Sequence, residues 1–335
     1  MHLFKRHFPL ARHSALLAVI AILTTLALLL VMILRPYRPP RPLVIAVAPS
    51  PLSSPVLLAK QLGYFDQLGL AVELNFCQHS EQCFDVLQNK QADLTTATTT
   101  ALVMHRQHLD NVTIFASFAQ SDNDIKLITR QPLYRPAQLQ KQIVGLTRHS
   151  ASEYFFDTLM QLSGNPASQI TKRYYSPQAL KQALLQHEVE LVALPEPGGY
   201  TLLSEVTGSR QFDTRGLFFA TVNLIGLPVS HARQLDDIQA VISALDKANH
   251  YIVTKPEDAK SRVAQTLAIP PAQLEWIWHD YRFALSLGNP LLSSLHHQAQ
   301  WAVKAGVLPQ NEVPDYREIV DPRPLRRFRR QQQMN

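Results

Sequence analysis

Residues 55–103 alternate between helical and extended patterns, and this alternation limits the fold more than any other feature of the chain. Apolar residues at helical spacing in residues 55–65 precede a strand pattern at residues 72–76, in which apolar and polar side chains alternate. A second helical pattern then leads to residues 92–94, where the chain becomes extended again. Strands that alternate with helices build a parallel sheet, so the pattern predicts an α/β fold.

Further apolar segments extend this architecture into a second sheet. We predict additional strands at residues 43–48, 112–118 and 126–130. A new alternation then begins, with a strand at 142–147, a helix from 151, a strand at 171–175, a helix at 177–187 and a strand at 190–194. Because this block alternates by itself, it should form a sheet of its own. Residues 217–227 are too apolar for a surface loop, and helical patterns dominate from residue 232.

Two segments carry a family resemblance: PVLLAKQLGYFDQLGLAVEL, which starts at Pro55, and QADL, which starts at Gln91. Their sequence and spacing resemble the solute-binding proteins of nitrate, sulfonate and taurine ABC transporters, a group that includes binders of thiamine-pyrimidine precursors. The family usually has a glycine in the turn that this chain builds from residues 89–91. The resemblance is densest over residues 43–103, continues as a pattern through the second half, and does not cover the first 42 residues.

The resemblance implies a two-lobed, type II periplasmic-binding-protein-like fold. In that family the chain passes from lobe one to lobe two and back, so that two crossings form a hinge. Mapped onto this chain, lobe one comprises residues 43–120 and 222–320, and lobe two comprises residues 121–221. The ligand of such a protein lies in the cleft between the lobes, and closure is a rigid-body motion that a ligand stabilises by contacting both sides.

An uncharged apolar run at residues 15–34 follows a basic segment at residues 1–14 and predicts a transmembrane helix. At about 1.5 Å per residue, such a helix spans the roughly 30 Å hydrocarbon core. A cleavable signal sequence is the alternative, but its apolar region would be shorter and followed by small residues, whereas this run ends at Arg35. We therefore predict an uncleaved, single-pass anchor, followed by a stiff stalk rich in proline and arginine at residues 35–42.

The net charge of +6 comes from the two ends of the chain. Residues 42–322 contain 21 basic and 26 acidic residues, so the globular part is mildly acidic and we predict no nucleic-acid partner. For the basic tail at residues 321–335, contact with anionic lipid headgroups and a disordered, solvated end are both open. Basic residues are equally frequent on both sides of the apolar run, so charge does not orient the anchor. The family resemblance implies an extracytoplasmic domain on the cytoplasmic (inner) membrane.

The two cysteines, Cys77 and Cys83, follow the strand at residues 72–76. In an oxidising compartment they could close a short loop as a disulfide. Two free buried thiols are the second alternative. A metal site is the third, because His79 lies between the cysteines, but a fourth ligand is missing and the spacing matches no common structural zinc site.

Ligands of parallel α/β sheets bind at the carboxyl ends of strands and the amino ends of helices, which selects four loops of this chain. In the first, Ser53 and Ser54 offer hydroxyl groups, although Ser54 next to Pro55 would also suit a helix cap. In the second, at residues 95–100, we prefer Thr98 and Thr99. A strand end followed by a helix cap would explain the same threonines without a ligand.

The third loop contains His149 and Ser150, whose neighbouring helix-end amides would suit an anionic head group. Ser150 and Glu153 also form a capping-box pattern, which explains them without any ligand. The fourth loop contains Glu196, which would favour a ligand with an amine or an amidine-like ring if it pointed into the cleft, but could instead cap a helix. Further ligand-binding candidates are Ser117 and Asn223 near the hinge and Tyr175 as an aromatic contact.

The sequence contains no motif of a serine hydrolase, a zinc protease, a phosphate-binding loop or a dinucleotide-binding loop. We therefore predict a protein that is not an enzyme and has no cofactor. The predicted function is that of a membrane-anchored, extracytoplasmic solute-binding protein. It would capture a small organic solute, sulfonate-, taurine-, nitrate- or pyrimidine-like, and present it to an ABC permease. A ligand sensor that signals occupancy to a membrane partner is the alternative.

Overall fold

The computed structural model describes residues 41–334, apart from residues 79, 106–110, 166–169 and 310–312. Residues 42–335 form a compact unit. The predicted anchor at residues 15–34 lies outside the described residues. Within the described part, no helix has the length and apolarity that crossing a membrane requires.

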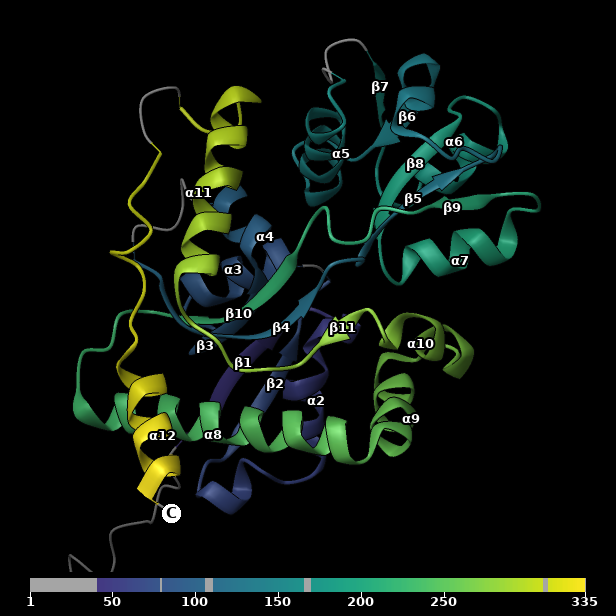
Figure 1. The fold of residues 1–335 in the computed structure, drawn as a ribbon. Coiled ribbons are helices and arrows are strands. Elements are labelled where there is room, and N and C mark those ends of the chain that lie inside the picture. The colour runs from purple at the N-terminus through teal and green to yellow at the C-terminus, as the bar shows by residue number, and fades with distance from the viewer. Residues whose placement is uncertain (1–40, 79, 106–110, 166–169, 310–312, 335) are drawn as a thin grey trace, which may run out of the picture. The chain divides into compact units, whose positions relative to one another are not determined.

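Six strands form the first sheet, in the order β11-β4-β10-β3-β1-β2 (Figure 1). β1 pairs in parallel with β2 and β3, whereas β10 is antiparallel to β3 and β4. The carboxyl ends of β1, β3 and β4 therefore lie at the same edge of the sheet as the amino end of β10. The strands are β1 (Leu43–Val47), β2 (Val72–Phe76), β3 (Leu94–Thr98), β4 (Thr113–Ser121), β10 (Ala220–Gly226) and β11 (Tyr281–Arg282).

Five strands form the second sheet, in the order β7-β6-β8-β5-β9. β6 is parallel to β7 and β8, and β5 is antiparallel to β8 and β9. The chain crosses between the sheets twice, from β4 to β5 and from β9 to β10. We call the first sheet with its helices lobe one and the second lobe two; the lobe limits given above stay a prediction. The strands are β5 (Ile125–Thr129), β6 (Ile143–Leu146), β7 (Thr171–Tyr174), β8 (Leu191–Pro195) and β9 (Arg210–Phe212).

Helices cover both faces of the first sheet (Figure 1). On one face, Ile45 and Val47 of β1 join a core with residues of α2 and α8. On the other face, Ile114 of β4 and Ile225 of β10 join a core with residues of α4 and α11. The helices of lobe one are α2 (Ser54–Gln61), α3 (Ser80–Gln88), α4 (Thr99–Met104), α8 (Ala232–Thr254), α9 (Pro256–Leu267), α10 (Pro271–Trp278), α11 (Asn289–Lys304) and α12 (Arg323–Met334).

The second sheet is also covered on both faces. Phe155 and Phe156 of α5 (Ala151–Leu162) pack with Leu127 of β5. Residues of α6 (Leu180–Leu185) and α7 (Gly198–Glu205) pack with Ile128 and Val192 on the opposite face. Short 3-10 helices complete the fold, at η1 (Pro51–Ser53), η2 (Asp66–Leu68) and η4 (Pro136–Lys141).

The turn between α3 and β3 shows why the family usually has a glycine there. Lys90 lies in this turn with a φ of 57°. Glycine adopts this left-handed conformation readily because it has no Cβ, whereas most other residues rarely do. The chain therefore keeps the backbone shape of the turn although the glycine is missing.

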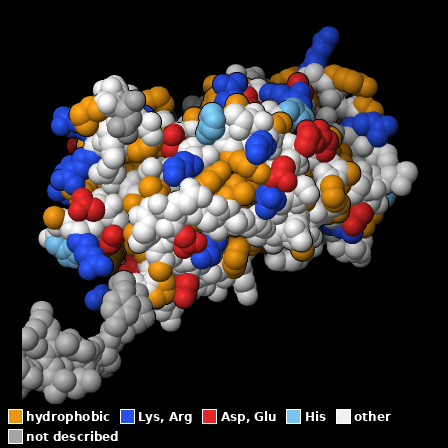
Figure 2. Space-filling view, turned by 90° about the horizontal axis from the view of Figure 1, so that it is seen from below, with side chains coloured by type: hydrophobic (Ala, Val, Ile, Leu, Met, Phe, Trp, Pro, Cys, Tyr) orange, Lys and Arg blue, Asp and Glu red, His pale blue; other side chains and the backbone are white. Residues whose placement is uncertain are grey.

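The basic tail forms helix α12, which contradicts the alternative of a disordered end for residues 323–334. Leu325 and Phe328 of α12 are buried, and the helix packs against α8. The five arginines of α12 are exposed. On the face in Figure 2, Lys and Arg are interspersed with Asp and Glu, and hydrophobic side chains lie between them. This face carries no continuous basic surface of the kind that binds nucleic acid.

Cys77 and Cys83 are joined by a disulfide, the first of the three alternatives above, and their Cα atoms are 5.5 Å apart. Both residues are buried, together with Ala46 and Ala92. The bond ties the end of β2 to the first turn of α3. His79, which the metal alternative requires, lies outside the described residues.

Candidate functional site

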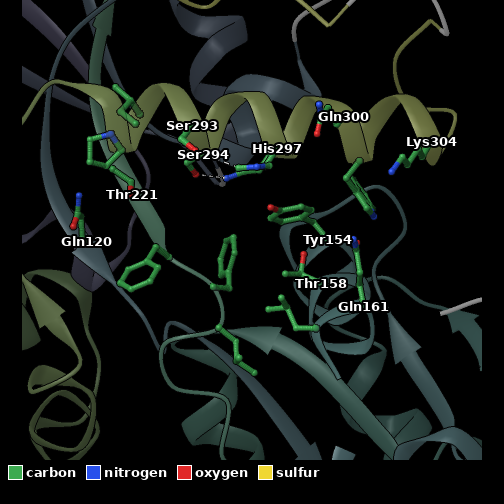
Figure 3. A pocket seen from close by; sticks show the side chains of 18 residues that line it. Gln120, Tyr154, Thr158, Gln161, Thr221, Ser293, Ser294, His297, Gln300 and Lys304 are labelled. Atoms are coloured by element: carbon green, nitrogen blue, oxygen red, sulfur yellow. Dashed lines mark hydrogen bonds between the residues drawn. The ribbon is translucent and has the colours of Figure 1, made fainter. Parts of the chain in front are cut away.

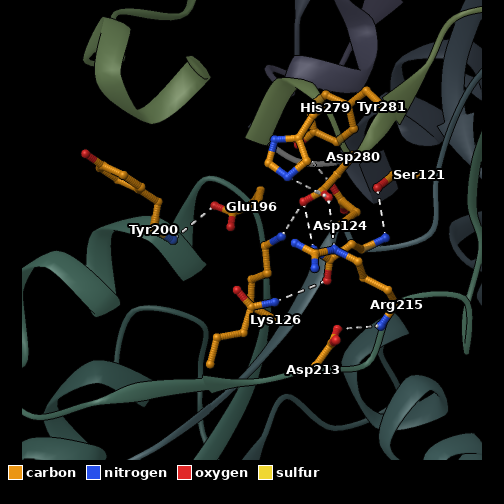
Figure 4. Close-up of polar contacts among 12 residues, drawn as sticks. Ser121, Asp124, Lys126, Glu196, Tyr200, Asp213, Arg215, His279, Asp280 and Tyr281 are labelled. Carbon is orange, nitrogen blue, oxygen red and sulfur yellow. Dashed lines mark hydrogen bonds and ion pairs between the residues drawn. The ribbon is translucent and has the colours of Figure 1, made fainter. Parts of the chain in front are cut away.

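Side chains from the two lobes meet in two places. One set surrounds the crossings and comprises Asn123, Asp124, Lys126, Glu196, Asp280 and Tyr281; we call it the hinge network (Figure 4). The other set lies between α5 of lobe two and α11 of lobe one. Both sets join residues that are far apart in the sequence.

A buried ion pair lies at the centre of the hinge network. Nζ of Lys126 on β5 is 2.8 Å from Oδ2 of Asp280, which follows α10, and the two side chains are 1% and 4% exposed. Asn123 donates a hydrogen bond of 2.8 Å to the same oxygen. Arg215 and His279 approach the other carboxylate oxygen at 3.6 and 3.3 Å. Because both charges of the pair have lost their water, each depends on the other for stabilisation.

Two further carboxyl groups lie close to this pair. Burial raises the pKa of Asp124 to about 6, against the lowering effects of a hydrogen bond from Tyr281 and of the charge on Lys126. Burial likewise raises the pKa of Glu196 to about 7, against the effects of the Tyr200 amide and of Lys126. Protons therefore stay on these two groups at pH values where exposed carboxyl groups are ionised.

Glu196 lies at the start of α7, where its two oxygens differ. Oε2 accepts a hydrogen bond of 3.1 Å from the N–H of Tyr200, and Oε1 is buried without a partner among the described residues. The helix-cap alternative therefore describes one of the two oxygens. A Cβ at Gly199 would lie 2.5 Å from Cγ of Lys126 and 2.8 Å from Oε1 of Glu196, so the packing of this network requires glycine.

An open cavity of about 640 Å³ lies between α5 and α11; we call it the interlobe groove (Figure 3). Tyr154, Thr158 and Gln161 point into it from α5, and His297 points into it from α11. The crossing from β9 to β10 closes one side of the groove and contributes three apolar residues. These are Leu217, Phe218 and Phe219.

Trp301 connects α11 to α5 beside the groove. Its Nε1 donates a hydrogen bond of 2.9 Å to Oδ2 of Asp157, and its ring meets that of Tyr154 edge to face at 5.4 Å. Tyr154 meets Phe218 in the same manner at 5.7 Å. Lys172 lies 2.6 Å from the other oxygen of Asp157 and balances its charge. Lobe one, lobe two and the crossing therefore all contribute to one aromatic contact.

Sequence reasoning missed Lys126, Asp124 and Asp280 of the hinge network, and Tyr154 and Trp301 of the groove. One signal was present: Lys126 interrupts the otherwise apolar strand at residues 125–129. A lysine in such a strand is buried only if it finds a partner. Nothing local identifies Asp280 as that partner.

The predicted residues of the first loop bond within that loop. Ser53 and Ser54 are buried, and their hydroxyl groups donate to the carbonyl groups of Ala48 and Pro51. In the second loop, β3 extends to Thr98 and α4 begins at the next residue, as the strand-end alternative expects. The hydroxyl of Thr98 caps α4 by accepting the N–H of Ala101 at 3.1 Å.

Three predicted residues, Thr99, Ser117 and Asn223, form one buried cluster. The hydroxyl of Ser117 donates to Oδ1 of Asn223 at 2.7 Å, and Nδ2 of Asn223 donates to the hydroxyl of Thr99 at 3.4 Å. The hydroxyl of Thr99 donates to the carbonyl group of Thr221 at 3.3 Å. Thr221 lines the interlobe groove, so the cluster lies directly behind it.

The predicted residues of lobe two are engaged within lobe two. Ser150 caps α5 by accepting the N–H of Glu153 at 3.4 Å, and Glu153 accepts the N–H of His149 at 2.7 Å. This second bond reaches one residue further back than the capping-box pattern. The hydroxyl of Tyr175 donates to Glu188 at 2.8 Å.

None of the ten predicted ligand-binding residues is among the described residues that line the groove. Their binding role stays a prediction.

A model of the NMT1/THI5-like family matches residues 50–259. The chain belongs to this family. No curated protein sequence matches it.

Solved structures share the fold of this NMT1/THI5-like chain at low sequence identity. The alkanesulfonate-binding protein SsuA from Xanthomonas axonopodis pv. citri, bound to MOPS, is 17% identical with a TM-score of 0.69, and the match covers 84% of this chain and 99% of that one. The periplasmic aliphatic sulphonate binding protein SsuA from Escherichia coli is 15% identical with a TM-score of 0.72, and the match covers 84% and 97%. These likenesses confirm the predicted two-lobed, type II periplasmic-binding-protein-like fold.

One structure with this fold is not a transport protein. A DszB mutant in complex with biphenyl-2-sulfinic acid is 13% identical with a TM-score of 0.62, and the match covers 86% of this chain and 99% of that one. DszB is an enzyme. The fold of the NMT1/THI5-like chain is therefore compatible with binding and with catalysis.

Replacing Lys126 by methionine should lower the free energy of unfolding by about 3–5 kcal/mol, because it leaves the buried carboxylate of Asp280 without its partner. Denaturant unfolding measures this loss, and adding Asp280→Asn to the same chain should recover part of it. Lys60→Met, at an exposed lysine, is the matched control and should change stability by less than about 0.5 kcal/mol. Equal losses in the two single variants would contradict a special role of the ion pair.

The raised pKa of Glu196 predicts that stability falls as the pH rises from 4.5 towards about 7. The folded protein holds this proton more tightly than the unfolded chain, so the stabilisation is complete below the ordinary pKa and is lost as the pH passes the raised one. Thermal unfolding across this range should show the fall, and Glu196→Gln should make it shallower. Glu318→Gln, at an exposed glutamate, should not. If both variants keep the slope of the parent chain, Glu196 is not its source.

Proposed function

We propose that this chain is an extracytoplasmic solute-binding protein that captures a small organic solute in the interlobe groove and presents it to the permease of an ABC importer. The observation that carries the proposal is the open groove of about 640 Å³ between α5 of one lobe and α11 of the other. A volume of roughly 300–1,000 Å³ is typical of small-molecule sites. The family and the sulfonate-binding proteins among the solved neighbours support binding rather than catalysis.

A solute in this groove would contact both lobes at once. Tyr154 and Thr158 belong to lobe two, whereas His297 and Trp301 belong to lobe one. A ligand shifts a conformational equilibrium only by its difference in affinity for the two states. A solute that bridges α5 and α11 has such a difference, because it loses half of its contacts when the lobes separate.

The location that we propose is outside the cytoplasmic membrane, with the apolar run at residues 15–34 as the anchor. The disulfide between Cys77 and Cys83 supports this location, because disulfides persist in oxidising compartments and are rare in the cytosol. The stalk at residues 35–42 would then hold the binding domain away from the lipid.

A thermal-shift screen of the full-length chain in detergent tests the binding role, with sulfonates, nitrate, pyrimidines and amines as solutes. A true ligand at one hundred times its dissociation constant should raise the free energy of unfolding by about 2.7 kcal/mol. Thr158→Trp should abolish the shift because it fills the groove. Thr201→Trp, at an exposed threonine on α7, should retain it. If no class of solute moves the midpoint, the proposed function loses its support.

Membrane extraction tests the anchor separately. The full-length chain should remain in the membrane fraction after washing with high salt and with alkaline carbonate, because a spanning helix is held by the hydrophobic effect rather than by charge. A chain that starts at residue 42 should be released. Release of the full-length chain by either wash would contradict an uncleaved anchor.

A further inference from the structure

We infer that the interlobe groove selects solutes that combine a planar aromatic ring with one anionic group. This inference rests on the proposed function and specifies the chemical class of its ligand. It is carried by the side chains of the groove, which are aromatic in the middle and carry a single formal charge.

Four aromatic side chains line the groove: Tyr154, Phe218, Phe219 and Trp301. Tyr154 already makes edge-to-face contacts with Phe218 and Trp301, which fixes the orientation of its ring. Phe219 is 51% exposed although it lies at the groove, and the neighbouring Leu162 is 64% exposed. Aromatic rings prefer offset-stacked or edge-to-face partners, so a flat ring placed here would cover apolar surface that now faces water.

The charge of the groove favours an anion. Lys304, in the last turn of α11, carries the one formal charge among the described lining residues, which otherwise contribute amide, hydroxyl, imidazole and apolar groups. Lys304 is exposed and forms no ion pair within the described part of the chain. Asp157, the carboxylate next to the groove, is already paired with Lys172. A single negative charge on the solute therefore finds a cation and meets no unpaired carboxylate.

The order of these groups along the groove gives the solute a direction. Figure 3 places Gln120 and Thr221 at one end, Tyr154 in the middle, and Gln161 and Lys304 at the other end. An aromatic ring beside Tyr154 would thus direct its acidic group towards Lys304.

The groove also contains an unfilled hydrogen-bonding position. Gln298 is 1% exposed and lines the groove, and its Nε2 donates to the hydroxyl of Ser294 at 3.0 Å. Its Oε1 is buried and has no partner among the described residues. A buried acceptor without a partner is costly, and an O–H or N–H group on the ring of a solute would satisfy it.

Calorimetric titration of the full-length chain in detergent tests the inference with two sulfonates of equal charge, naphthalene-2-sulfonate and hexane-1-sulfonate. The aromatic sulfonate should bind about tenfold more tightly, as expected when aromatic contacts add to area burial. Phe219→Leu should reduce this preference. Phe76→Leu is the matched control, because Phe76 is also 51% exposed but lies outside the groove lining, and it should retain the preference.

The role of the charge is tested by Lys304→Gln, which should weaken both sulfonates. Lys60→Gln is its control, since Lys60 is an exposed lysine in the last turn of α2. Equal or tighter binding of hexane-1-sulfonate would overturn the aromatic preference and leave the proposed function intact. Binding of a cationic or uncharged solute, with neither sulfonate bound, would overturn the inferred ligand class in the same way. If no solute of any class binds, the proposed function fails with it.

Discussion

The arrangement of the two lobes depends on the buried ion pair between Lys126 and Asp280. The lysine belongs to β5 of lobe two and the aspartate to the segment after α10 of lobe one, so the pair is formed only while the lobes are in contact. Separating them would leave two charges in a poorly solvated place, each costing several kcal/mol unless water enters. The pair thereby holds the crossings in place, and with them Phe218 and Phe219, which close one side of the groove.

The hinge network and the groove differ in chemistry, and this difference suggests different roles. The hinge network is closely packed and polar: a Cβ at position 199 would not fit, and Glu196 and Asp124 have raised pKa values. The groove is open, and the contact between Trp301 and Asp157 crosses it with a single hydrogen bond. We therefore propose that the hinge network is the lasting contact between the lobes, and that the groove is the part that opens to admit a solute.

The fold could be predicted from the sequence because its signals are local. Alternating and helical patterns found the strands and helices on both sides of Gly69, and the pattern around Ser150 placed the start of α5. The site could not be predicted in the same way, because its contacts join surfaces rather than neighbours. Lys126 and Asp280 are 154 residues apart. Trp301 and Asp157 are 144 residues apart. Periodicity places each of these residues on an element but does not tell which elements meet.

The rule that ligands bind at strand ends found residues near the crossings but not the groove itself. Thr99, Ser117 and Asn223 were selected by that rule, and they form a hydrogen-bonded cluster behind Thr221. The groove lies further along α5 and α11, at Tyr154 and Trp301, beyond the helix starts that the rule considers.

A crystal structure of this chain with a bound solute tests most directly whether the lobes act as a clamp around the groove. We predict density for a solute that contacts α5 and α11 at the same time and lies beside Tyr154 and Trp301, with the ion pair between Lys126 and Asp280 intact. Density that contacts a single lobe, for example at the loop of Ser53, with an empty groove would contradict it.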